Sequence, residues 1–153
     1  MENNLSRNKQ HELNTICIYD ALTYVYSGQE FSVEEIMSSI FEKEYVEIPS
    51  FDKEVVIKSL THLDEIISIF QEKMPKMSFD RLNLLERSIL IMSYTNFKFV
   101  GGVDKRVVID TAIKLSKKYL GTDYSGKDDY KFVNAILDNV LWRKIMKLSQ
   151  LHL

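Results

Sequence analysis

The chain has 153 residues, which suits one compact domain with its own buried core. Lys and Arg total 20 against 22 Asp and Glu, and the formal net charge is -2 at pH 7. This balance argues against a uniformly basic protein that binds nucleic acid without regard to sequence, and against an acidic tail protein. Cys17 is the single cysteine, which excludes an intramolecular disulfide and a cysteine zinc site and favours a cytoplasmic location.

The charge changes sign along the chain. Residues 1–50 carry three basic and nine acidic side chains, a net charge of -6. Residues 51–100 carry seven of each, and residues 101–153 carry ten basic and six acidic side chains, a net charge of +4. A slightly acidic protein can therefore present a basic face if the fold gathers these side chains.

No segment is expected to enter a membrane. The first residues lack the continuous apolar stretch of a signal peptide. The longest apolar runs, such as residues 89–92, are far shorter than the roughly 20 residues that a spanning helix needs.

The apolar spacing of the first half predicts three helices. The first ends near Ser27 and carries a stripe that includes Tyr19 and Tyr26. Ser32 is placed to cap a short second helix that runs through Phe41. Apolar residues then alternate at steps of four and three over residues 56–70, which predicts one continuous third helix.

The second half predicts three further helices. Ser78 is placed to cap the first of them, whose apolar face fades near Asn96 before a turn at the two glycines 101–102. A long helix follows over residues 103–120, and a final one runs from about Asp128 toward Leu148. The sequence therefore predicts an all-α protein, a compact bundle of six to seven helices.

Residues that could carry catalysis are scarce. The three histidines are far apart in the sequence, and Cys17 lies in an apolar run that favours a buried structural thiol. No phosphate-binding glycine motif is present. We therefore expect no catalytic residues, no metal and no cofactor, although an unrecognised enzyme stays an alternative if the fold creates a polar pocket.

Two short stretches are typical of nucleic-acid contacts. Arg7, Lys9 and His11 lie at the start of the first helix, where Arg7 and His11 share one face. Lys131 and Phe132 combine a cation with an aromatic ring that could stack on an unpaired base. Taken alone, the first stretch is better explained as a solvated helix end, and the second as part of a helix with a core aromatic residue.

Several motifs in the same order resemble the family of the bacterial transcription antitermination factor NusB. The run Lys131–Asp138 is similar to its C-terminal signature, Glu86–Leu90 to its Glu-Arg-hydrophobic helix, and Ile109–Lys117 to its I-N-E-A-I-E-L-A-K helix. At the N-terminus, Arg7–Glu12 resembles its arginine-rich start R-R-x-A-R-E and Cys17–Asp20 its A-L-Y-Q motif. The resemblance is strongest over residues 78–141.

The resemblance implies a single NusB-like domain over residues 1–153, with packed helical subdomains at about 1–76 and 77–148. It implies binding of single-stranded boxA-type RNA together with a small-subunit ribosomal protein (NusE), within the RNA polymerase antitermination complex. By position it assigns RNA contacts to Arg7, Lys9, His11, Asp128, Lys131 and Phe132, and partner contacts to Tyr19 and Glu86. Members of the family occur as monomers and as homodimers, and the sequence does not choose between these states.

The N-terminal arginine cluster of the family is thinned in this chain. Asn8 replaces a cation, and His11 is mostly neutral at pH 7. Fewer phosphate contacts predict a modest intrinsic affinity for RNA that depends on the ribosomal partner. Residues 142–153 add three cations that are equally typical of a helix end. The alternative function is a helical protein–protein adaptor that has kept the fold and lost RNA binding.

Overall fold

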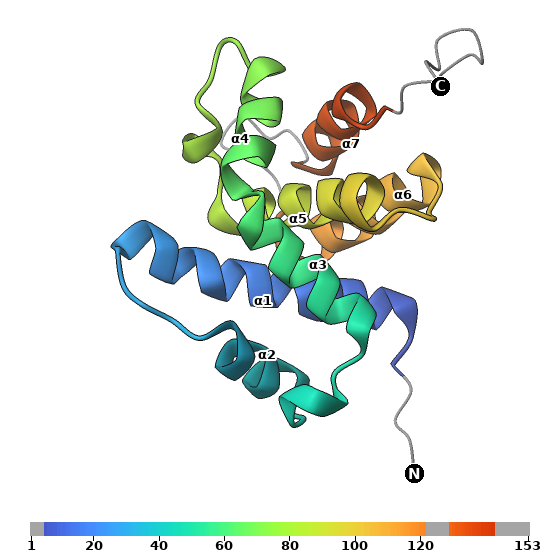
Figure 1. Ribbon diagram of the computed structural model, residues 1–153. Coiled ribbons are helices and arrows are strands. Elements are labelled where there is room, and N and C mark those ends of the chain that lie inside the picture. Colours follow the sequence, from blue (N-terminus) through green and yellow to red (C-terminus); the bar gives the residue numbers. More distant parts are fainter. Residues whose placement is uncertain (1–4, 122–128, 143–153) are drawn as a thin grey trace, which may run out of the picture.

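The computed structural model describes residues 5–121 and 129–142, which form seven α-helices and no strand (Figure 1). The all-α prediction is confirmed. The elements in chain order are α1 (Arg7–Ser27), α2 (Val33–Phe41), η1 (Tyr45–Glu47), α3 (Ser50–Thr61), α4 (Leu63–Glu72), η2 (Phe79–Arg81), α5 (Leu84–Thr95), η3 (Asn96–Val100), α6 (Lys105–Tyr119) and α7 (Asp129–Val140).

Helix α5 lies at the centre of the bundle, with α1, α3, α4, α6 and α7 around it (Figure 1). All side chains over residues 88–97 are buried, because α5 is covered on every side. Such a helix can be apolar all round, whereas an outer helix needs only one apolar stripe. The larger core cluster contains residues from both sides of position 76, so the division into two subdomains stays a prediction.

Helix α1 separates two core clusters. Ile18 and Leu22 are buried in the larger cluster, while Cys17 and Ala21 face a smaller cluster with residues of α2 and α3. This division explains why the predicted stripe on α1 is partly wrong: Leu22 is fully buried, but Tyr19 and Tyr26 are 39% and 46% exposed. A helix that packs on two sides leaves a third face for solvent.

The single helix predicted over residues 56–70 is two helices. His62 ends α3 and precedes α4, with a backbone conformation of φ -101° and ψ 20°. The His62 ring stacks on Phe99 with 4.2 Å between ring centroids, a contact that the change of direction permits. The apolar stripe continues across the bend because Leu63 and Phe70 still face the core. Periodicity alone could not show the break.

Caps decide where helices begin. Ser32 caps α2 as predicted, its Oγ accepting a hydrogen bond from the Glu35 amide at 3.2 Å. The prediction for Ser78 is wrong, because Ser78 precedes the short η2 and makes no side-chain capping bond. Asn83 caps α5 instead, with its Oδ1 accepting from the Leu85 amide at 2.8 Å.

Of two other predicted helix boundaries, the glycine turn after α5 is confirmed and the end of the last helix is not. The turn at Gly101 and Gly102 is confirmed, and both residues adopt positive φ angles of 77° and 74°, which favour glycine. Helix α7 ends at Val140, before the predicted end near Leu148, and residues 143–153 lie outside the described part of the chain. Lys98 stabilises this end, because its Nζ donates to the Trp142 carbonyl at 3.2 Å and lies over the indole ring.

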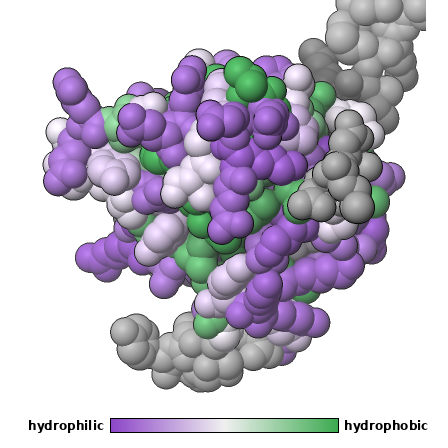
Figure 2. Space-filling model, turned by 90° about the horizontal axis from the view of Figure 1, so that it is seen from below, coloured by the Kyte–Doolittle hydropathy of each residue, from purple (hydrophilic) through white to green (hydrophobic). Residues whose placement is uncertain are grey.

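The face seen in Figure 2 is mainly hydrophilic, with a band of hydrophobic side chains across its centre. The apolar side chains that reach the surface include Val46, which is 84% exposed. Isolated exposed apolar residues are normal in a folded domain and need no special account.

The rings of Phe70, Phe79 and Tyr94 form one aromatic group in the core, and Phe70 and Phe79 stack at 5.5 Å. We expect Phe79→Ala to lower the free energy of unfolding by about 3–5 kcal/mol, since it leaves a cavity in a fully buried site. Val46→Ala, at an exposed position, is the control and should change the free energy of unfolding by less than about 0.5 kcal/mol. Urea denaturation measures the free energy of unfolding of both variants. Equal losses would show that Phe79 does not fill a closely packed core site.

Candidate nucleic-acid interface

The N-terminus of α1 presents two of the predicted cations. Ser6 caps the helix, its Oγ accepting from the Lys9 amide at 3.1 Å. Arg7 and Lys9 are both exposed, and the Arg7 guanidinium lies 3.7 Å from the centre of the Phe51 ring. A planar guanidinium stacked on an aromatic face is held in place while its outer donors stay available to an anion.

His11 lies in the interior, whereas the sequence prediction placed it at an RNA-binding surface. It is 3% exposed, and its ring packs on the Phe51 ring in a T-shaped arrangement with 5.8 Å between the ring centroids. Burial, helped by the nearby Arg7 charge, lowers the pKa of His11 from 6.5 to about 4. Arg7 and His11 do share one face of α1, but that face packs on Phe51, and His11 carries no charge at neutral pH.

A buried polar group fixes α1 against α3. The Asp52 carboxylate, at the start of α3, accepts hydrogen bonds from Gln10 Nε2 at 2.8 Å and Asn14 Nδ2 at 2.9 Å. Burial raises the pKa of Asp52, and the two amide bonds and the Arg7 charge oppose that rise. The hydrogen bonds compensate for the removal of the carboxylate from water and set the position of the cationic helix end.

A second polar group joins α1 to the end of α6. The Glu12 carboxylate accepts from Lys118 Nζ at 3.0 Å and from the Tyr119 hydroxyl at 2.9 Å, and Lys9 Nζ lies 3.3 Å away. Hydrogen bonds from these three groups outweigh the effect of burial and lower the pKa of Glu12. Lys118 and Tyr119 could not be found from the sequence, because the contact spans 106 and 107 residues and no local pattern signals it.

The start of α7 meets the same end of α6. Lys117 Nζ lies 4.6 Å from the centre of the Tyr130 ring, and the Asp129 amide donates to the Gly121 carbonyl at 3.0 Å. The neighbouring Lys131 is exposed, while Phe132 is half-buried against the larger core cluster. Asp128 lies outside the described residues.

The structure therefore gathers cations from three helix ends. We call the following five side chains the basic cluster: Arg7 and Lys9 from α1, Lys117 and Lys118 from α6, and Lys131 from α7. Tyr119 and Tyr130 lie among them and offer aromatic surface. Cations with interspersed rings suit phosphates and unstacked bases of a single strand.

The two residues predicted to bind a protein partner differ in exposure. Tyr19 is 39% exposed on α1, whereas Glu86, in the first turn of α5, is 5% exposed. Tyr26, seven residues after Tyr19 and on the same side of α1, lies under the Arg87 guanidinium at 4.8 Å. This contact places the start of α5 beside the exposed tyrosines.

Within residues 5–121 and 129–142, no group of three or more His, Cys, Asp or Glu side chains is arranged to hold a metal ion. In the same ranges no helix is long and apolar enough to cross a membrane.

Comparison with known proteins identifies the family. The NusB family matches residues 22–141, and the chain belongs to this family. It is 32% identical to the transcription antitermination protein NusB of Borreliella burgdorferi over 112 residues, which are 72% of this chain and 75% of that protein. It is 34% identical to the Finegoldia magna protein of the same name over 94 residues, 61% of this chain and 65% of the relative.

The fold agrees with this assignment. A crystal structure of Thermotoga maritima NusB superposes with a TM-score of 0.69 at 24% identity, covering 90% of this chain and 91% of that one. The resemblance read from the sequence motifs is thus confirmed, and the family is one of antitermination factors, not enzymes. The aligned segments span less than two thirds of the F. magna and Treponema denticola proteins, 65% and 62% of their lengths.

The low pKa of His11 predicts a pH dependence of stability. The unfolded chain binds a proton near pH 6.5 that the folded chain excludes until about pH 4, so stability is lost as the pH falls between these values. Lowering the pH from 7 to 5 therefore reduces the free energy of unfolding by about 2 kcal/mol through His11 alone.

His11→Phe keeps a ring against Phe51 and removes the titration. Denaturant unfolding at both pH values should show wild type losing about 2 kcal/mol more than the variant. Equal losses in the two proteins would show that His11 does not carry the effect.

Proposed function

We propose that the protein is a transcription antitermination factor that binds single-stranded boxA-type RNA together with the ribosomal protein NusE, in the cytoplasm and within the RNA polymerase antitermination complex. The observation that carries this proposal is the basic cluster, which joins the two predicted RNA-binding stretches through the end of α6. Family membership supports the same conclusion.

The proposed RNA path follows the cluster. Arg7 and Lys9 neutralise phosphates at the start of α1, Lys117 and Lys118 continue the positive surface, and Lys131 ends it on α7. The Glu12 carboxylate at its centre offsets part of this charge. Five cations with one carboxylate among them support moderate RNA affinity, and the ribosomal protein supplies additional contacts.

The proposed partner surface lies on the exposed side of α1. Tyr19 and Tyr26, seven residues apart on the same side of α1, are 39% and 46% exposed and give an apolar surface with hydroxyl groups. Tyrosines in such a position are typical anchors of protein interfaces. We retain Glu86 as a candidate contact, and since its side chain is buried, its role requires a local rearrangement or an indirect effect through neighbouring groups.

Lys117→Ala tests the role of the α6 end. We expect weaker binding of a labelled boxA-type RNA and a decrease of about 0.7 in the slope of log affinity against log salt, the effect of one lost phosphate contact. Lys76→Ala removes an equal charge beyond the end of α4 and is the matched control. Fluorescence anisotropy at several salt concentrations, with and without NusE, measures both; identical slopes in the two variants would contradict the proposed path.

Substitutions of Phe132 and Lys131 distinguish an RNA-binding factor from a protein–protein adaptor. Phe132→Leu keeps an apolar side chain against the core but removes a ring, so we expect about 5- to 150-fold weaker RNA binding if a base stacks there. Lys131→Glu should weaken binding as well. Thermal unfolding monitored by circular dichroism checks that both variants are folded. Unchanged RNA affinity in both would favour the adaptor.

A further inference from the structure

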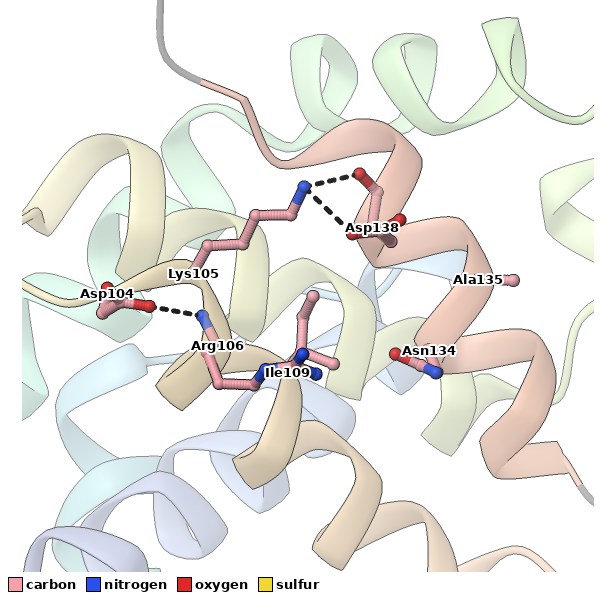
Figure 3. Close-up of a pocket in the computed structure, with 7 residues that line it drawn as sticks. All are labelled: Asp104, Lys105, Arg106, Ile109, Asn134, Ala135 and Asp138. Atoms are coloured by element: carbon pink, nitrogen blue, oxygen red, sulfur yellow. Dashed lines mark hydrogen bonds and ion pairs between the residues drawn. The ribbon is translucent and has the colours of Figure 1, made fainter.

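A groove of about 440 Å³ lies between the start of α6 and the middle of α7 (Figure 3). Ile109 and Ala135 give it apolar surface, and Arg106 and Asn134 are among its polar lining residues. Asn134 is the exposed amide within the Lys-Phe-Val-Asn run of α7. None of these four residues belongs to the basic cluster or to the partner surface.

The two polar side chains come from different helices. In the view of Figure 3 the Arg106 guanidinium overlaps Ile109, and the oxygen of the Asn134 amide is turned toward that side of the groove. In the described part of the chain, neither side chain makes a hydrogen bond or an ion pair. Their donors and the Asn134 acceptor are thus available to a ligand.

The rim of the groove carries charges of both signs. Lys105 Nζ donates to the Asp138 carbonyl at 2.8 Å and contacts its carboxylate at 3.1 Å, which fixes one end. Asp104 caps α6, its Oδ1 accepting from the Arg106 amide at 2.7 Å. With two carboxylates, one lysine and one arginine, the charges of the lining sum to zero. A neutral, planar ligand with hydrogen-bonding edges fits this balance better than an anion does.

The groove continues the proposed RNA path. Asn134 follows Lys131 by three residues on one face of α7, about 4.5 Å further along the helix axis. A strand held at Lys131 can therefore place its next base over Ala135 and Ile109. This step rests on the proposed function.

We propose that the groove binds one base of the RNA, and that this base is guanine. Arginine offers paired donors that match the O6 and N7 acceptors of guanine, whereas adenine places a donor beside N7. Asn134 can accept from a remaining N–H group of the base, and the apolar side chains cover part of its face. Arg106 and Asn134 are then residues that determine sequence preference, distinct from the phosphate-binding cluster.

The test compares labelled uridine 12-mers: one all uridine, one with a single central guanosine and one with adenosine at the same position. We expect wild type to bind the guanosine RNA at least about fivefold more tightly than the other two. Arg106→Lys keeps the charge but loses the paired donors, and Asn134→Ala loses the amide. Both should bind the all-uridine RNA like wild type and lose the guanosine preference.

Arg81→Lys and Asn139→Ala are the matched controls, since both replace exposed side chains that do not line the groove. They should keep the preference. No guanosine preference in wild type, or one that survives Arg106→Lys and Asn134→Ala, would overturn the inference while leaving RNA binding that depends on Lys117 intact. Failure of wild type to bind any of the three RNAs or a boxA-type RNA, with NusE present, would overturn the proposed function, and the inference with it.

Discussion

The Glu12 carboxylate receives hydrogen bonds from Lys118 and Tyr119, 106 and 107 residues further along the chain. Because Glu12 lies one turn after the exposed cations of α1, this contact brings those cations beside the lysines at the end of α6. The side chain of Glu12 is 14% exposed, so water screens the contact less than it screens a typical surface ion pair. It holds the start of α1 against the end of α6, while the bonds that Asp52 accepts from Gln10 and Asn14 hold α1 against α3.

The same contact limits how positive the surface can become. A carboxylate among five cations reduces their mutual repulsion, which lets them lie close together in the absence of RNA. It also competes with phosphate for Lys9 and Lys118. An interface of this kind favours ligands that add interactions besides charge, such as base stacking, over polyanions in general. The net charge of -2 is compatible with this local arrangement, because it sums the whole chain, whereas the basic cluster is confined to three helix ends.

Helix content was predictable because apolar periodicity and caps are local, as the stripe over residues 56–70 and the Ser32 cap show. The break at His62 was not, because the apolar stripe continues across it and the Phe99 ring that stacks on His62 there lies far along the chain. In the site, Arg7 and Lys9 could be found from their position at a helix start. His11 could not be distinguished from them, because its burial depends on Phe51. Lys117 and Lys118 read as ordinary solvated lysines until α1 and α7 are placed against them.

Cys17 is fully buried between α1 and the smaller core cluster, and burial raises the pKa of its thiol to about 12. A thiol in that state reacts with alkylating reagents only when the surrounding helices open, since the thiolate is the nucleophile. The rate of Cys17 alkylation therefore reports opening of the α1–α2 contact, residue-specifically and without an engineered label. Because the sequence contains no second cysteine, a cysteine introduced on the surface would be the one fast-reacting position for a spectroscopic probe.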